Sequence, residues 1–169
     1  MKWIILSFTL MISSIMMGQS SGISSEFQKE IDSYLDKTIS TITVEQVSAM
    51  DSGRFVLLDA REKEEFETST IPGSQYIGYD DFDVESISHL PKGQPIIVFC
   101  SIGYRSEKIG EKLKEAGYGR VFNLYGSIFA WANAGLPLHT PEGTSTEKLH
   151  TYNKKWSKWV ENPKVKKVW

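Results

Sequence analysis

Three short runs rich in apolar residues constrain the fold of this chain more than any other feature. They lie at residues 55–58, 96–99 and 121–123, and a helical pattern follows each of them. Strands without a polar face are typical of a parallel sheet that is covered on both sides. We therefore predict an α/β fold with an open, mainly parallel sheet and helices on both faces.

Chemically useful side chains follow two of these predicted strands. Cys100, the only cysteine, comes directly after the run at 96–99, and Asp59 and Arg61 follow the run at 55–58. In open parallel sheets, ligands bind outside the carboxyl ends of the strands. The predicted fold thus brings the thiol and an acid–base pair to one edge of the sheet.

Helical patterns also define the domain organisation. Phe27, Ile31, Leu35 and Ile39 recur every fourth residue, which predicts an amphipathic helix over 24–39. We expect an N-terminal helical extension at 21–42, one domain at 43–140, and a linker with a basic tail at 141–169. Further helices are expected between residues 43 and 53 and at 62–67, 83–90, 105–116 and 127–134. A short strand is expected at 76–77.

The first residues resemble an export signal. Lys2 precedes a largely apolar stretch at 3–17, which a polar run at 19–22 ends. The stretch is shorter than the roughly 20 residues that span a membrane, and a small-x-small site lies at 18–20. We predict a signal peptide at 1–20 and an exported, periplasmic or secreted protein with no stable span after cleavage. The alternatives are an uncleaved anchor and a buried helix.

The tail combines lysines with aromatic residues. It either engages anionic lipid or an envelope protein partner, or it forms a short helix at 152–160 whose Trp156 and Trp159 pack on the domain. The net charge of −2 gives no reason to expect a nucleic-acid partner. The three histidines, which we expect at the surface, have no ligand spacing with Cys100, so we expect no metal.

The segment 99–106 carries the chemistry. Cys100 stands at a strand end and enters a tight loop that opens a helix, whose positive N-terminus favours a thiolate. Gly103 has the backbone freedom to turn successive N–H groups inward around an anion, and Arg105 adds a positive charge. The alternative is an inert cysteine buried at the end of a core strand.

Four ordered motifs resemble the rhodanese-like family of sulfurtransferase domains, in a single-domain exported form. The resemblance covers about residues 43–140. The motifs are the Cys100 loop, Leu-Leu-Asp-Ala-Arg-Glu at 57–62, Ile-Pro-Gly-Ser at 71–74, and the Ala-Trp and Ala-Gly-Leu-Pro signature within 124–137. The chain departs from the family at Ser69-Thr70, where Gly-His is common, and at Gly126-Ser127, where Gly-Gly is common.

The resemblance implies a mechanism without a cofactor. Cys100 would take a sulfane sulfur from thiosulfate or a persulfide as its own persulfide and pass it to a thiol or to cyanide. Asp59 and Arg61 would organise the rim of the site; the alternative is a structural role, in which Asp59 caps backbone N–H groups at the strand end and Arg61 forms a salt bridge. The loop that would hold the persulfide consists of Ser101, Ile102, Gly103, Tyr104 and Arg105.

Loop length and charge separate this interpretation from its rivals. Four residues lie between Cys100 and Arg105, whereas related phosphatases and arsenate reductases have five. Only Arg105 is charged in the loop, which makes thiosulfate a weaker expectation than sulfur transfer itself. A non-catalytic binding module and a thiol redox partner remain the alternatives; without a second cysteine, the latter would act through intermolecular exchange.

Overall fold

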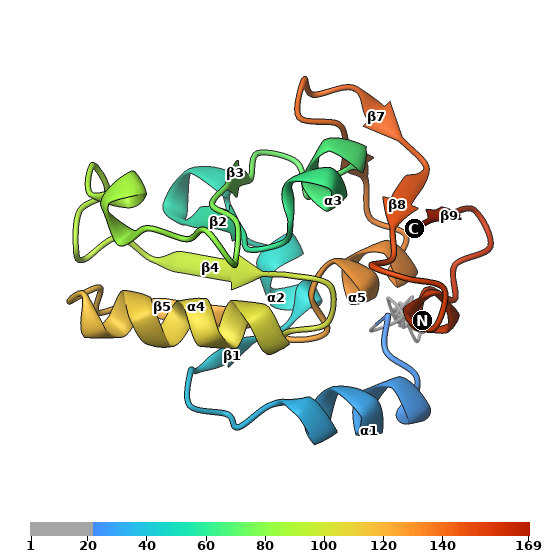
Figure 1. The fold of residues 1–169 in the computed structure, drawn as a ribbon, viewed down its shortest axis with the longest axis horizontal. Helices are drawn as coiled ribbons and strands as arrows, with labels where there is room; N and C mark the ends of the chain where they lie inside the picture. The colour runs from blue at the N-terminus through green and yellow to red at the C-terminus, as the bar shows by residue number, and fades with distance from the viewer. Residues whose placement is uncertain (1–21) are drawn as a thin grey trace, which may run out of the picture.

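A five-stranded parallel sheet forms the centre of the computed structural model, which describes residues 22–169. The predicted signal peptide at 1–20 lies outside the described residues. The strand order is β1-β5-β4-β2-β3 (Figure 1). The strands are β1 Thr41–Ile42, β2 Val56–Asp59, β3 Gln75–Tyr76, β4 Ile96–Phe99 and β5 Val121–Leu124.

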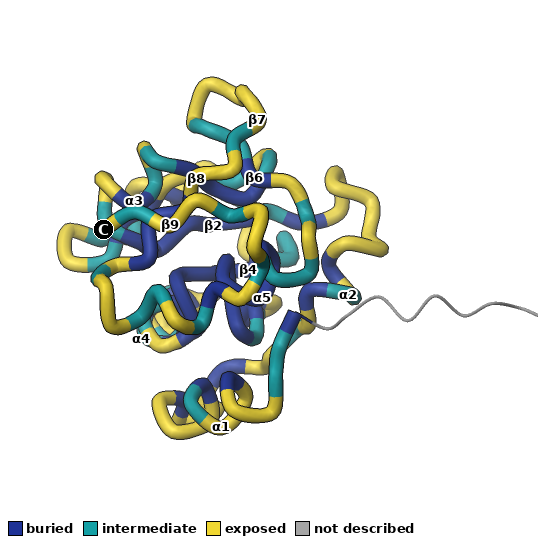
Figure 2. Tube along the Cα trace, turned by 90° about the vertical axis from the view of Figure 1, so that its right-hand side faces the viewer, coloured by how far each residue is buried: buried dark blue, intermediate teal, exposed yellow. Residues whose placement is uncertain are grey.

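Helices cover both faces of this sheet, which confirms the predicted fold class. Alternate residues of β4 point to opposite sides: Ile97 packs in one hydrophobic core with α2 and α5, and Val98 packs in a second core with α4. Figure 2 shows the buried segments gathered along the sheet and the exposed ones outside it. The helices are α1 Ser25–Tyr34, α2 Val44–Ser48, α3 Lys63–Thr68, α4 Tyr104–Glu115 and α5 Ser127–Asn133, with 3-10 turns at Ser52–Arg54, Val84–Ile87 and Trp156–Trp159.

The N-terminal helix is shorter than predicted. It ends at Tyr34, and Leu35 is already extended, although Leu35 and Ile39 are buried as their spacing suggested. The Glu107 carboxylate explains the end, because it accepts hydrogen bonds from the backbone N–H groups of Asp36 at 2.9 Å and Thr38 at 3.0 Å. The chain then adds the edge strand β1, which the helical interpretation of 21–42 did not include.

The C-terminal segment is folded onto the rest of the molecule. Its strands are β6 Leu138–His139, which pairs with β7 Ser145–Thr146, and β8 Lys148–His150, which pairs with β9 Lys166–Val168. The expected helix at 152–160 is only a 3-10 turn, but the predicted packing is confirmed. The Trp159 ring stacks on Phe27 with centroids 5.4 Å apart, and Trp156 meets Tyr34 edge-on at 5.4 Å.

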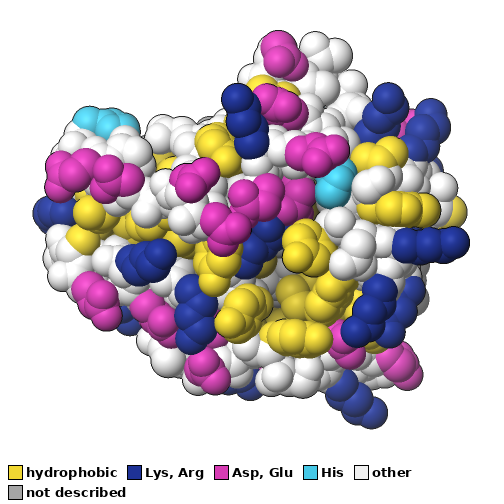
Figure 3. Space-filling view, viewed as in Figure 1, with side chains coloured by type: hydrophobic (Ala, Val, Ile, Leu, Met, Phe, Trp, Pro, Cys, Tyr) yellow, Lys and Arg dark blue, Asp and Glu magenta, His cyan; other side chains and the backbone are white. Residues whose placement is uncertain are grey.

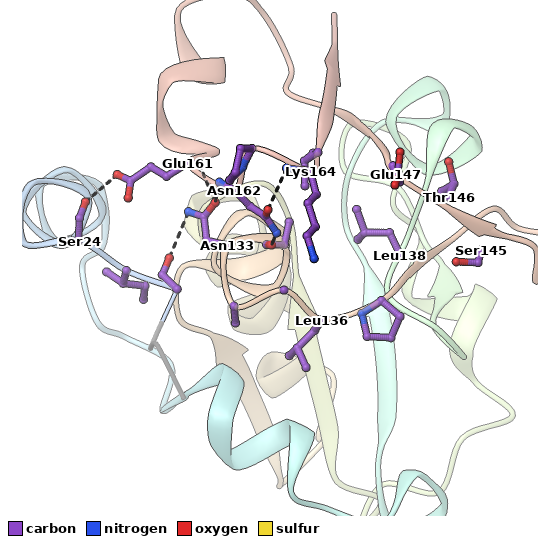
Figure 4. A pocket seen from close by; sticks show the side chains of 18 residues that line it. Ser24, Asn133, Leu136, Leu138, Ser145, Thr146, Glu147, Glu161, Asn162 and Lys164 are labelled. Carbon is purple, nitrogen blue, oxygen red and sulfur yellow. Dashed lines mark hydrogen bonds between the residues drawn. The ribbon is translucent and has the colours of Figure 1, made fainter. Parts of the chain in front are cut away.

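Asn133 joins both ends of the described chain to α5 (Figure 4). Its Nδ2 donates to the carbonyl oxygens of Gly22 at 3.2 Å and Trp159 at 2.9 Å. Its Oδ1 accepts from the backbone N–H groups of Glu161 at 2.7 Å and Asn162 at 3.2 Å. One side chain thereby holds the N-terminal and C-terminal segments together.

His150 is buried with 8 % of its surface exposed, where a surface histidine was predicted, because β8 pairs with β9 and packs against α3. In residues 22–169, no helix has the length and hydropathy needed to cross a membrane.

Candidate active site

Cys100 lies where the sequence placed it, at the carboxyl end of β4 in the centre of the sheet. Its backbone N–H donates to Ser127 Oγ at 3.1 Å, so the first residue of α5 anchors it. Only 1 % of the residue is exposed, yet it lines a cavity. The thiol is therefore held rigidly at the base of an opening in the surface.

The loop after Cys100 turns polar hydrogens toward the sulfur. Gly103 precedes α4 with φ of 128°, a conformation that favours glycine, and its N–H lies 3.2 Å from Cys100 Sγ. Asn123 Nδ2 holds the Gly103 carbonyl at 2.9 Å, and Ser106 Oγ lies 3.6 Å from the sulfur. The Gly103 N–H and the Ser106 hydroxyl are thus directed at the Cys100 sulfur.

These groups favour the thiolate. Burial by itself raises the pKa of the Cys100 thiol, but the charge of Arg105 and the hydrogen bonds from Ser106 and Gly103 lower it, and the net pKa is below the usual value. Ser106 has one hydroxyl proton and also lies 2.7 Å from Asn123 Oδ1, so its bond to sulfur is shared. The charge of Arg105 makes the largest contribution to the lowering of this pKa.

Glu65 is the site residue that sequence reasoning missed. This carboxylate is 2 % exposed and binds Arg105 at two points, with Nη1–Oε2 2.6 Å and Nη2–Oε1 2.8 Å; it also accepts from Ser101 Oγ at 3.0 Å. Burial raises the pKa of Glu65, but Arg105 outweighs it and the pKa is lowered. Nothing in the charged segment 62–67 distinguishes this glutamate from its exposed neighbours. The positive charge expected at the loop is therefore largely compensated.

Asp59 and Arg61 form a buried clamp beneath the site and do not line the cavity. Arg61 binds the carboxylate with Nε–Oδ1 2.9 Å and Nη2–Oδ2 2.7 Å, and neither side chain is exposed. Thr70 Oγ1 donates to Asp59 at 2.7 Å, and Arg61 donates to the Ser69 carbonyl. The pair therefore fixes the segment before the Ile-Pro-Gly turn. Arg61 reaches the site only through its charge, which lowers the pKa of Glu65.

A cavity of about 560 Å³ opens above Cys100. Figure 3 shows hydrophobic side chains gathered around a hollow, with acidic side chains beside it. Segments that we predicted to lie outside the domain contribute to it: Tyr34 from α1, and Tyr152 and Trp156 from the tail. The remaining lining residues are Glu62, Tyr79, Asp80, Ser101, Ile102, Tyr104 and Arg105.

A second cavity of about 680 Å³ lies between the N-terminal segment, the end of α5 and the tail (Figure 4). Although it is larger, its lining contains no cysteine or histidine, and Asn133 within it already uses both of its polar atoms. Of these two cavities, the one above Cys100 is the one that contains a nucleophile.

Curated relatives share this domain. A sulfurtransferase of Allochromatium vinosum is 36% identical over 93 residues, which cover 55% of this chain and 86% of that protein. The thiosulfate sulfurtransferase GlpE of Actinobacillus succinogenes is 36% identical over 92 residues, covering 52% of this chain and 78% of that protein.

Solved structures agree on the fold. A rhodanese-related protein of Thermoplasma volcanium superposes with a TM-score of 0.53 at 24% identity, covering 59% of this chain and 96% of that chain. A thiosulfate sulfurtransferase of Pseudomonas aeruginosa gives 0.56 at 24% identity, covering 70% of this chain and 23% of that chain. The profile of the rhodanese-like domain matches residues 43–134, with the cysteine loop inside the match. The chain belongs to the rhodanese-like domain family.

Proposed function

We propose that the protein is a sulfurtransferase that carries sulfur as a persulfide on Cys100. The observation that carries this proposal is the position of the Cys100 sulfur, which receives the Gly103 N–H at 3.2 Å and faces a cavity. The lowered pKa of the thiol supplies the nucleophile, and curated sulfurtransferases share the surrounding domain.

The first half-reaction loads the cysteine. The Cys100 thiolate attacks the outer sulfur of a donor, thiosulfate or a persulfide; the new S–S bond forms as the donor's own bond to that sulfur breaks. The electron pair leaves on sulfite or on a thiolate. We assign to the loop 101–105 the role of holding the negative charge of the persulfide with its N–H groups.

The second half-reaction removes the sulfur from Cys100. A nucleophilic acceptor, such as a thiolate or cyanide, attacks the terminal sulfur of the persulfide, and the Cys100 thiolate leaves with the electrons of the broken S–S bond. Neither half changes the overall redox state or calls for a metal. We further propose that the protein acts after export, as the sequence of residues 1–20 suggests.

Intact-protein mass spectrometry tests the proposal. The chain without residues 1–20 is incubated with thiosulfate or with a small persulfide, beside Cys100→Ser. We expect one added sulfur atom on the wild type only, removed by cyanide. If neither donor loads a thiol that is shown to be free and reactive, the enzyme proposal fails and a binding module becomes the better interpretation.

A further inference from the structure

The wall above Cys100 is aromatic and comes from distant parts of the chain. Tyr34 meets Tyr104 edge-on with centroids 6.4 Å apart and Trp156 at 5.4 Å, and the Arg105 guanidinium lies 5.4 Å from the Tyr152 ring. Tyr79 also lines the cavity. Aromatic faces carry partial negative charge and attract organic cations.

The charged groups of the cavity also favour a positively charged ligand. Arg105 is its only cation, and that guanidinium is already bound at two points by the buried Glu65. Glu62 and Asp80 remain at the rim, where the Glu62 carboxylate also interacts with the Asp80 backbone N–H. Glu62 lies 3.9 Å from Arg105, a longer contact than either bond to Glu65. Two carboxylates thus contact the one guanidinium, and Asp80 adds a further negative charge to the lining of the cavity.

Mutual repulsion of the rim carboxylates supports this electrostatic picture. Partial burial and the neighbouring charge of Asp80 raise the pKa of Glu62, and the opposite effect of Arg105 is smaller. A positive group placed between Glu62 and Asp80 would relieve this repulsion. A dianion such as thiosulfate would be repelled by both carboxylates as it approached Cys100.

We propose that the sulfur donor is a small organic persulfide with a positively charged substituent. Its ammonium group lies among the aromatic faces, near Glu62 and Asp80, while its outer sulfur reaches Cys100. The reaction is Cys100–S⁻ plus R–S–SH giving Cys100–S–S⁻ plus R–SH, in which the proton passes from the transferred sulfur to the leaving thiolate. This inference rests on the proposed persulfide chemistry and specifies its donor.

A series of donors matched in size and varied in charge provides the test. The probes are the persulfides of cysteamine, 2-mercaptoethanol and thioglycolate, which are cationic, neutral and anionic, together with thiosulfate. Loading rates of Cys100 are measured by mass spectrometry at low and high salt. We expect the cationic donor to load on the order of tenfold faster than the anionic one at low salt, and less so at high salt.

Paired variants test whether the rim carboxylates cause the preference for a cationic donor. Glu62→Gln with Asp80→Asn should reduce the difference between cationic and anionic donors to about twofold, because the rim then lacks its two charges. Glu64→Gln with Asp81→Asn is the matched control: it removes the same charge from adjacent exposed positions that do not line the cavity. Trp156→Leu should raise the KM for the cationic donor more than for the neutral one.

The outcomes separate the two proposals. If no donor loads Cys100, the sulfurtransferase proposal itself fails. If all donors load at similar rates, if the anionic donors load fastest, or if the control pair changes the preference as much as the rim pair, sulfur transfer stands and the inferred donor class is wrong.

Discussion

Glu65 and Arg105, 40 residues apart in the chain, form a two-point ion pair in which Arg105 lines the active-site cavity and Glu65 is buried behind it. The pair orients the guanidinium from α4 against a carboxylate on α3, and Ser101 bridges them from within the loop, donating to Glu65 and accepting from Arg105 at 2.9 Å. The loop around Cys100 is thus tied to a helix on another part of the sheet edge.

Replacing this carboxylate should affect stability strongly. Glu65→Gln leaves the partly buried Arg105 without its two-point counter-ion, and we expect a loss of about 2–3 kcal/mol in the free energy of unfolding, measured by urea denaturation. Glu67→Gln, on the exposed face of α3, should change it by less than about 0.5 kcal/mol. The folded variant should also show a lower pKa of Cys100, because Arg105 is no longer compensated; a higher pKa would contradict this arrangement.

Ser106 should help to set the ionisation of the thiol. Ser106→Ala removes one hydrogen-bond donor to the sulfur, so the pKa of Cys100 should rise and the pH profile of its alkylation by iodoacetamide should move to higher pH. Below the pKa the alkylation rate should fall a few-fold, since only the thiolate reacts. Ser88→Ala, at an exposed position, should leave the profile in place. An unchanged profile in the Ser106 variant would assign its hydroxyl to Asn123 alone.

Asp59 and Arg61 should act on folding and not on the reactivity of the thiol. Asp59→Asn leaves Arg61 buried and unpaired, with an expected loss of about 3–5 kcal/mol in the free energy of unfolding. The double change Asp59→Leu with Arg61→Leu should cost less than the sum of the two single changes, as denaturation curves would show. Folded molecules of each variant should retain the alkylation profile of Cys100. A shifted profile would instead give the pair a direct role at the rim.

Asn133 should control the attachment of the C-terminal segment. Asn133→Leu removes four hydrogen bonds, each worth about 1 kcal/mol, and we expect a loss of roughly 2–4 kcal/mol in the free energy of unfolding. Trypsin should also cut the lysine-rich turn before Trp156 faster than in the wild type. Ser145→Ala, an exposed residue of the same cavity, serves as the control. Unchanged proteolysis would mean that the aromatic packing alone holds the tail.

Local patterns in the sequence were sufficient for the central elements of the fold. The apolar runs at 96–99 and 121–123 are strands β4 and β5, and the helix predicted at 105–116 is α4, shifted by one residue. Short-range signals of this kind show whether a segment is buried and how often apolar residues recur along it. The same logic placed Cys100 at the carboxyl end of a central strand, because that position depends only on where the strand ends.

Elements stabilised by distant partners were not predictable in this way. Strand β1 has two residues, too few to show a period, and exists because β5 pairs with it. The helix predicted over 24–39 stops at Tyr34 because the Glu107 carboxylate, about 70 residues further on, binds the backbone that follows. A periodic pattern continues through such a break, since Leu35 and Ile39 are buried in either conformation.

The amino-acid sequence by itself determined the nucleophile, its loop and the family to which the domain belongs, since these depend on residues adjacent in the chain. The tertiary structure decided what surrounds the nucleophile: Glu65 compensates Arg105, Asp59 and Arg61 lie beneath the site, and Tyr34 and Trp156 cover the cavity. Periodicity shows that a side chain is buried or exposed, but its partner depends on how whole elements pack against one another.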